Sequence, residues 1–113
     1  MRNVFLALGI VGALGCATSP PVAQQEQSSA SIRAAEEVGA THVPQAALHL
    51  QLAKEEFAAA RAERSDKDRA GRLLARAQAD ADLALALART DAERSEAQTA
   101  VDQLNHFNLS VPQ

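Results

Sequence analysis

Apolar residues recur along two stretches of this chain at the spacing of an α-helix. In both stretches they advance by alternating steps of four and three residues, which places them on one face of a helix. The first stripe lies within residues 44–64, at Ala46, Leu50, Ala53, Phe57 and Ala60. The second lies within residues 65–105, at Ala70, Leu74, Ala77, Ala81, Ala84 and Ala88. The pattern predicts two helices that pack along a seam of small side chains.

Residues that commonly begin and end helices divide this part of the chain into three helices. Gly39 suits the position just past a helix end, so a short helix is predicted over residues 30–38. Pro44 suits the first position of the second helix, because a proline there loses no hydrogen bond. Ser65 and Asp68 have the spacing of a capping box, with Ser65 as the N-cap of the third helix.

The third helix is predicted to be the longest element, because no Gly or Pro interrupts the chain between Gly71 and Pro112. It would continue to about residue 105, a length of about 60 Å at 1.5 Å per residue. The predicted fold is all-α: a short N-terminal helix plus a long antiparallel helical hairpin with an Ala-rich seam. Phe57 is the largest side chain expected in its core. Three leucines widen the apolar band of the third helix, so that the first helix can cover it: Leu73, Leu83 and Leu87.

The distal part of the third helix has a different apolar face. Ala97, Val101 and Leu104 lie on another side of the helix from the stripe that ends at Ala88. This half of the helix is therefore expected either to project freely or to offer a surface to a partner. The alternative is a break at residues 90–93, which spell a second possible capping box but include no turn residue.

The first sixteen residues have the organisation of a secretion signal. Arg2 supplies a positive charge, and residues 4–15 form an uncharged run of about 12 residues, too short to span a membrane as a helix. We predict that residues 1–15 are a signal peptide. The run ends at Cys16, the only cysteine of the chain, so an intramolecular disulfide is excluded.

Small residues followed by this cysteine resemble the lipobox of bacterial lipoproteins. The resemblance implies that the Cys16 thiol receives a diacylglycerol, that cleavage occurs before Cys16 and that the new amine is acylated, for example with palmitate. Ala13 departs from the pattern, because the lipobox usually has leucine three residues before the cysteine. Ala13 and Gly15 also fit ordinary secretory cleavage, which would leave an unmodified Cys16 and a soluble periplasmic or secreted protein.

The segment after Cys16 bears on location and tethering. Lipoproteins retained in the inner membrane typically carry aspartate after the cysteine, whereas this chain has Ala17, so the resemblance implies the outer membrane and its periplasmic face. Residues 16–29, rich in Pro, Gln and Ser, are predicted to be a flexible tether for the lipid. A helical domain over residues 30–107 and a tail over residues 108–113 would follow.

Composition and charge restrict the function classes. Without residues 1–15 the chain has ten basic and fourteen acidic residues, a net charge of −4, and it lacks Trp and Tyr. Both features argue against nucleic-acid binding. His42, His49 and His106 are not spaced as helical metal ligands, and no nucleophile motif or phosphate loop is present. We therefore predict no catalytic residue, metal or cofactor.

Two polar residues lie beside the apolar stripes. Arg76 and Asp80 are four residues apart, so a surface ion pair between them is expected at the rim of the seam. His49 lies between apolar residues and is expected to be an ordinary flanking side chain.

The helical region resembles domain-of-unknown-function family 4398, which occurs in bacterial envelope lipoproteins. The resemblance covers about residues 30–90. It depends on Gly39, Ala40, Pro44, Ala53, Ala60 and the alanine ladder of the third helix. His42 and Val43 stand where that family often has an aromatic residue and alanine. The resemblance implies a helical envelope domain and assigns no catalytic residue.

Together these features predict a lipid-anchored structural or interaction module that docks onto another envelope protein. Two alternatives remain: a small helical module that binds a hydrophobic ligand, and an accessory subunit of an envelope complex. The narrow alanine seam argues against the ligand-binding alternative, because small side chains close helices together instead of opening a cavity.

Overall fold

The computed structural model describes residues 21–110, which form an all-α fold, as predicted. The elements are α1 (Pro21–Glu37), the short 3₁₀ helix η1 (Ala40–His42), α2 (Pro44–Ala62) and α3 (Lys67–Ser110). The predicted signal peptide, residues 1–15, and Cys16 lie outside the described residues. No helix in the described part of the chain combines the length and the apolar character needed to cross a membrane.

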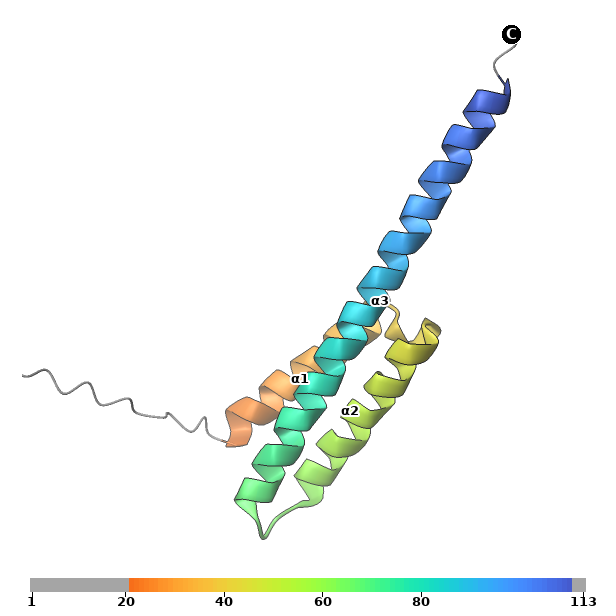
Figure 1. The fold of residues 1–113 in the computed structure, drawn as a ribbon. Helices are drawn as coiled ribbons and strands as arrows, with labels where there is room; N and C mark the ends of the chain where they lie inside the picture. Colours follow the sequence, from red (N-terminus) through yellow and green to blue (C-terminus); the bar gives the residue numbers. More distant parts are fainter. Residues whose placement is uncertain (1–20, 111–113) are drawn as a thin grey trace, which may run out of the picture.

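The helices α1 and α2 both pack against the first half of α3, which runs between them in the view of Figure 1. The helices α2 and α3 form the predicted antiparallel hairpin, and α1 runs in the same direction as α3 (Figure 1). Because η1 turns the chain from α1 into α2, the start of α1 lies at the same end of the bundle as the α2–α3 turn.

The helix α1 begins at Pro21, nine residues before the predicted start, so the tether prediction is wrong for residues 21–29. Packing against α3 accounts for the difference. The Ser28 hydroxyl is buried, and it lies 2.9 Å from the Gln24 carbonyl and 3.0 Å from the Leu74 carbonyl of α3, both of which can accept its hydrogen bond. Farther along, Ile32 and Ala35 are buried in the core. Residues 21–29 are polar and lack the apolar spacing of a helix, but contact with α3 accounts for their helical structure.

Both predictions for the turn between α1 and α2 are confirmed. Gly39 adopts a left-handed conformation with φ of 83°, which a residue with a Cβ rarely adopts, and its N–H donates to the Glu36 carbonyl at 3.0 Å. Pro44 is the first residue of α2. Buried Ala40 places the turn against the core.

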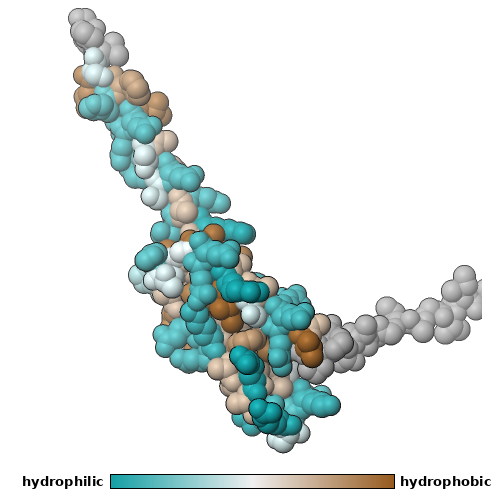
Figure 2. Space-filling model, turned by 180° about the vertical axis from the view of Figure 1, so that it is seen from behind, coloured by the Kyte–Doolittle hydropathy of each residue, from teal (hydrophilic) through white to brown (hydrophobic). Residues whose placement is uncertain are grey.

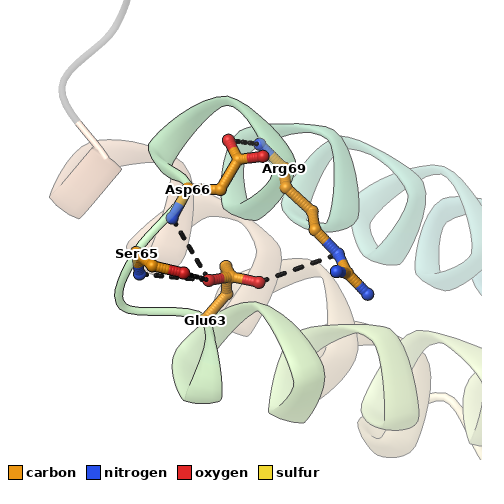
Figure 3. Close-up of polar contacts among 4 residues, drawn as sticks. All are labelled: Glu63, Ser65, Asp66 and Arg69. Atoms are coloured by element: carbon orange, nitrogen blue, oxygen red, sulfur yellow. Dashed lines mark hydrogen bonds and ion pairs between the residues drawn. The ribbon is translucent and has the colours of Figure 1, made fainter.

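The α2–α3 turn differs from the predicted capping box. Asp66, and not Ser65, caps α3, since its carboxylate accepts the Arg69 N–H at 2.8 Å (Figure 3). Glu63 Oε1 accepts hydrogen bonds from the Ser65 hydroxyl at 2.7 Å, the Ser65 N–H at 3.0 Å and the Asp66 N–H at 3.2 Å. These bonds, foremost that from the Ser65 hydroxyl, hold the pKa of the Glu63 carboxyl below its usual value. The capping box fails because α3 starts one residue later than it requires.

The seam between α2 and α3 follows the predicted register. Nine of its predicted positions are buried: Ala46, Leu50, Ala53, Ala60, Leu74, Ala77, Ala81, Ala84 and Ala88. The two exceptions are Phe57 and Ala70, which are only partly buried. The Phe57 ring packs partly against the core, and the Arg61 guanidinium lies 5.9 Å from the ring centroid. The Phe57 ring is larger than the alanine and leucine side chains that fill the seam, and it lies at the seam's edge.

The helix α3 continues without a break through residues 90–93 to Ser110. The Thr90 hydroxyl, at the predicted alternative break, donates to the Ala86 carbonyl one turn earlier at 3.0 Å. The predicted tail is wrong for residues 108–110, which belong to the helix, and residues 111–113 lie outside the described part of the chain. About half of α3 thus extends past the bundle (Figure 1).

Candidate functional site

The projecting half of α3 is the longest fully exposed stretch among residues 21–110, and we call residues 91–110 the distal segment. Every residue in it is exposed. Its apolar side chains include Leu104, 63 % exposed, and Phe107, 70 % exposed, together with Val101 and Leu109. Figure 2 shows hydrophobic residues gathered near the free end of this helix. Large apolar groups gathered on one surface commonly mark a site of association.

The distal segment has no packing partner within the described chain. Most helical stability in proteins comes from tertiary packing and not from intrinsic propensity, so the end of a helix that packs on nothing is only marginally stable in water. A bound partner that covered Leu104 and Phe107 would supply that packing. The segment therefore has the properties of a docking helix.

Amide hydrogen exchange should separate the two halves of α3. We expect amides of the distal segment to exchange much faster than those of residues 74–88, since opening it breaks no tertiary contact. Mass spectrometry of the purified protein would measure both. Equal protection in the two halves would show that the distal segment packs on something, including a second copy of the chain.

A row of four charged or titratable side chains crosses one flank of the α2–α3 seam. The His49 Nδ1 lies 2.8 Å from the Asp80 Oδ1, and the Arg76 Nη2 lies 2.9 Å from the Glu56 Oε1. His49, Asp80 and Glu56 are all partly buried, and the Glu56 side chain is only 12 % exposed. The row therefore links α2 to α3 twice, once through His49 and Asp80 and once through Glu56 and Arg76.

The predicted ion pair between Arg76 and Asp80 within α3 does not form, because both side chains find partners on α2. A signal for this pairing exists in the sequence. Each of the four residues directly precedes a seam position, so in an antiparallel hairpin all four share one flank. Glu56 has no oppositely charged residue three or four positions away on α2, so a pairing pattern along one helix does not identify it.

Burial raises the pKa of the Glu56 carboxyl above its usual value. The Arg76 guanidinium opposes this rise, whereas the Asp80 carboxylate adds to it by its charge and by accepting a hydrogen bond from the protonated form. The Glu56 Oε2 is buried and has no hydrogen-bond partner among the described residues. An ionised Glu56 is thus poorly accommodated despite its ion pair.

Replacing Glu56 with glutamine should change how stability depends on pH. A pKa raised by folding favours the folded state below the unfolded pKa of about 4.5, and that contribution is lost as the pH rises through the folded pKa. We therefore expect the stability of Glu56→Gln, relative to that of wild type, to increase as the pH rises from about 4 to about 7. Thermal unfolding across this range would measure it, with the exposed neighbour Glu55→Gln as control. A constant difference across the range would contradict the raised pKa.

The row has the elements of proton-transfer chemistry but no reacting group. In the described chain, no Ser, Thr or Cys side chain is hydrogen-bonded to His49. His42 and His106 are exposed and lie in η1 and the distal segment, and residues 21–110 contain no group of three potential metal ligands. Cys16, the predicted lipidation site, lies outside the described residues. The row is best explained as a polar link between α2 and α3.

A groove lined by arginines lies on the first turns of α3. Its walls are formed by Arg69, Arg72, Leu73 and Arg76, and its volume is about 350 Å³. Two of these arginines form ion pairs: Arg69 with Glu63, the residue after α2, at 3.7 Å, and Arg76 with Glu56 of α2. The groove thus presents three cationic groups at the turn end of the bundle.

Comparisons with models of protein families, with curated proteins and with solved structures gave no match. The resemblance to family 4398 therefore depends on the residues quoted for it and stays a prediction. Function must be argued from the surfaces of this molecule.

Proposed function

We propose that this protein is a lipid-anchored interaction module of the bacterial envelope, without catalytic activity, and that it docks onto an envelope protein. The observation that carries this proposal is the distal segment, a fully exposed helix with Val101, Leu104, Phe107 and Leu109 along it. Val101, Leu104 and Phe107 are spaced three residues apart and so lie on one side of the helix, an arrangement suited to a groove or a helical face of a partner.

The anchor is supported by the sequence. An uncharged run ends at the single cysteine, and small residues precede Cys16 as in the lipobox. Ala17 favours the outer membrane, and the protein would face the periplasm. An anchor at one end of the chain and an exposed helix at the other suit a protein that holds a partner near a membrane.

Alanine side chains disfavour the alternative of a hydrophobic ligand between the helices. Ala53, Ala77, Ala81 and Ala84 are fully buried along the seam, so α2 and α3 approach each other closely. A ligand there would have to separate the helices. An accessory subunit of an envelope complex would use the same distal segment and differs only in the nature of its partner.

Replacing Cys16 with alanine should abolish lipidation. We expect metabolic labelling with palmitate to mark the wild-type chain, and the Cys16→Ala chain to remain unlabelled and uncut or soluble. Ser65→Ala, which leaves the cysteine in place, is the control. Labelling that persists in Cys16→Ala would contradict the lipoprotein assignment, and an unlabelled wild type would favour a soluble periplasmic or secreted protein.

Photo-crosslinking in living cells tests the docking surface. A photoreactive amino acid at Leu104 or Phe107 should form adducts with one discrete envelope protein, whereas the same group at exposed Ala58 of α2 should not. Adducts from all three positions, or from Ala58 alone, would place the contact on the bundle and contradict the proposal.

A further inference from the structure

We propose that the turn end of the bundle rests on anionic phospholipid headgroups, which Arg69, Arg72 and Arg76 contact through their guanidinium groups, while the distal segment points away from that membrane. The inference depends on the proposed lipid anchor, because the anchor determines which end of the molecule meets the bilayer. The ligand chemistry is the phosphate of an anionic lipid.

The turn end of the bundle is positively charged, whereas the rest of the described chain is negatively charged. Residues 61–76 contain six basic and three acidic residues, a net charge of +3. The rest of the described chain contains four basic and eleven acidic residues, a net charge of −7. An anionic surface would attract the turn end and repel the remainder, so the charges alone favour one orientation.

The arginines of the groove have free donors for phosphate. Arg69 contacts Glu63 through Nε, and Arg76 contacts Glu56 through Nη2, but their side chains are 65 % and 70 % exposed. No ion pair is found for Arg72 within the described residues, and it is exposed between the other two. A guanidinium has five N–H donors, so the paired arginines keep donors for a phosphate oxygen.

The proposed anchor lies at this same end. The Gln24 side chain of α1 reaches Gly71 of α3, since its Oε1 is 3.5 Å from the position of a Cβ there. Ser28 is hydrogen-bonded to Leu74 one turn farther along α3. The first turns of α1 therefore lie beside the first turns of α3, next to the α2–α3 turn (Figure 1).

The chain between the lipid and the bundle is short. Four residues separate Cys16 from Pro21, and a fully extended chain advances at most about 3.6 Å per residue, or about 18 Å in five steps. The predicted tether to residue 29 would have reached more than twice as far. Because α1 begins at Pro21, the short connection keeps the turn end of the bundle within reach of the headgroups. The arginines can then approach to within the screening length of about 8 Å in physiological salt.

Fluorescence quenching in vesicles tests this orientation. The full lipidated chain would carry a fluorophore on Ser65→Cys or on Ser95→Cys, in vesicles of phosphatidylcholine alone or with one-third phosphatidylglycerol and a headgroup-linked quencher. We expect phosphatidylglycerol to increase quenching at position 65 at least twofold and to leave position 95 unchanged. Equal quenching at position 65 in both vesicles would overturn the proposal.

Charge variants identify the contacting side chains. Arg69→Gln, Arg72→Gln and Arg76→Gln together should remove the increase, whereas neutralising Arg33, Arg89 and Arg94 with glutamine should not. The single change Arg72→Gln breaks no observed ion pair and should lower the increase by about a third, so the test does not depend on the fold of the triple variant. An increase that is the same in Arg72→Gln and the triple variant as in wild type would overturn the proposal.

Two further experiments distinguish lipid phosphate from free phosphate and test the arginine surface independently of the anchor. Inorganic phosphate and chloride at equal ionic strength should reduce the increase equally, and a selective effect of phosphate would identify a free-phosphate site instead. If palmitate labelling shows that Cys16 is not acylated, the proposed anchor fails separately. Sedimentation of the unlipidated full chain with the same vesicles then tests the arginine surface, which equal pelleting of wild type and triple variant would refute.

Discussion

Replacing Leu50 with alanine should unfold most of the bundle near ordinary temperature. Leu50 is 2 % exposed and is one of the two largest fully buried apolar side chains, the other being Leu74. Its neighbours in the seam are alanines, which cannot move enough to fill the space. Leucine-to-alanine changes in such sites cost about 2–5 kcal/mol, and a small domain of this kind holds only about 3–5 kcal/mol in total.

Thermal unfolding followed by helical circular dichroism would measure the loss. Each kcal/mol shifts the midpoint of a domain of this size by about 4–8 °C, so we expect a decrease of at least about 10 °C. Leu48→Ala on the same helix is the control, because Leu48 is 58 % exposed. A Leu50→Ala midpoint equal to that of the control would show that the α2–α3 register differs from the one described.

Enlarging Ala81 to leucine should also destabilise the fold, here by overpacking. Ala81 is fully buried at the centre of the seam, and a longer side chain there would have to separate α3 from α2. Such changes cost typically about 1–3 kcal/mol. The separation would also disturb the adjacent pair of Asp80 with His49, so we expect the effect at the upper end of that range.

Ala79→Leu is the matched control for this second change. Ala79 is exposed on the same helix, so the same added volume should leave the unfolding midpoint nearly unchanged. A large decrease in Ala79→Leu would mean that helix propensity, and not packing, explains the loss. An unchanged midpoint in Ala81→Leu would mean that the seam contains space for a larger side chain.

Phe57 shows that the size of a side chain does not by itself predict how much its truncation destabilises the fold. Its place in the stripe predicts the largest cavity on truncation, but the ring is half-buried and lies against Arg61. The seam at that level is lined by small residues such as Ala53 and Ala60, so the ring lies at its edge. The largest energetic contribution therefore belongs to the smaller but fully enclosed Leu50.

The sequence by itself determined the elements whose signals are local. The four-and-three spacing of small apolar residues determined the α2–α3 seam, because residues with that spacing must share a helix face. Gly39 and Pro44 determined the turn between α1 and α2, because few other residues fit those backbone positions. The exposed face of the distal segment followed from the shift of its apolar positions past Ala88.

Only the tertiary structure decided the features that depend on contact between distant segments. The helix α1 extends back to Pro21 because Ser28 is buried against Leu74, a contact 46 residues apart that no local pattern contains. Asp80 pairs with His49 instead of Arg76 because the antiparallel register brings α2 nearer than the next turn of α3. In both cases a polar side chain had several possible partners, and the packing of the apolar seam selected among them.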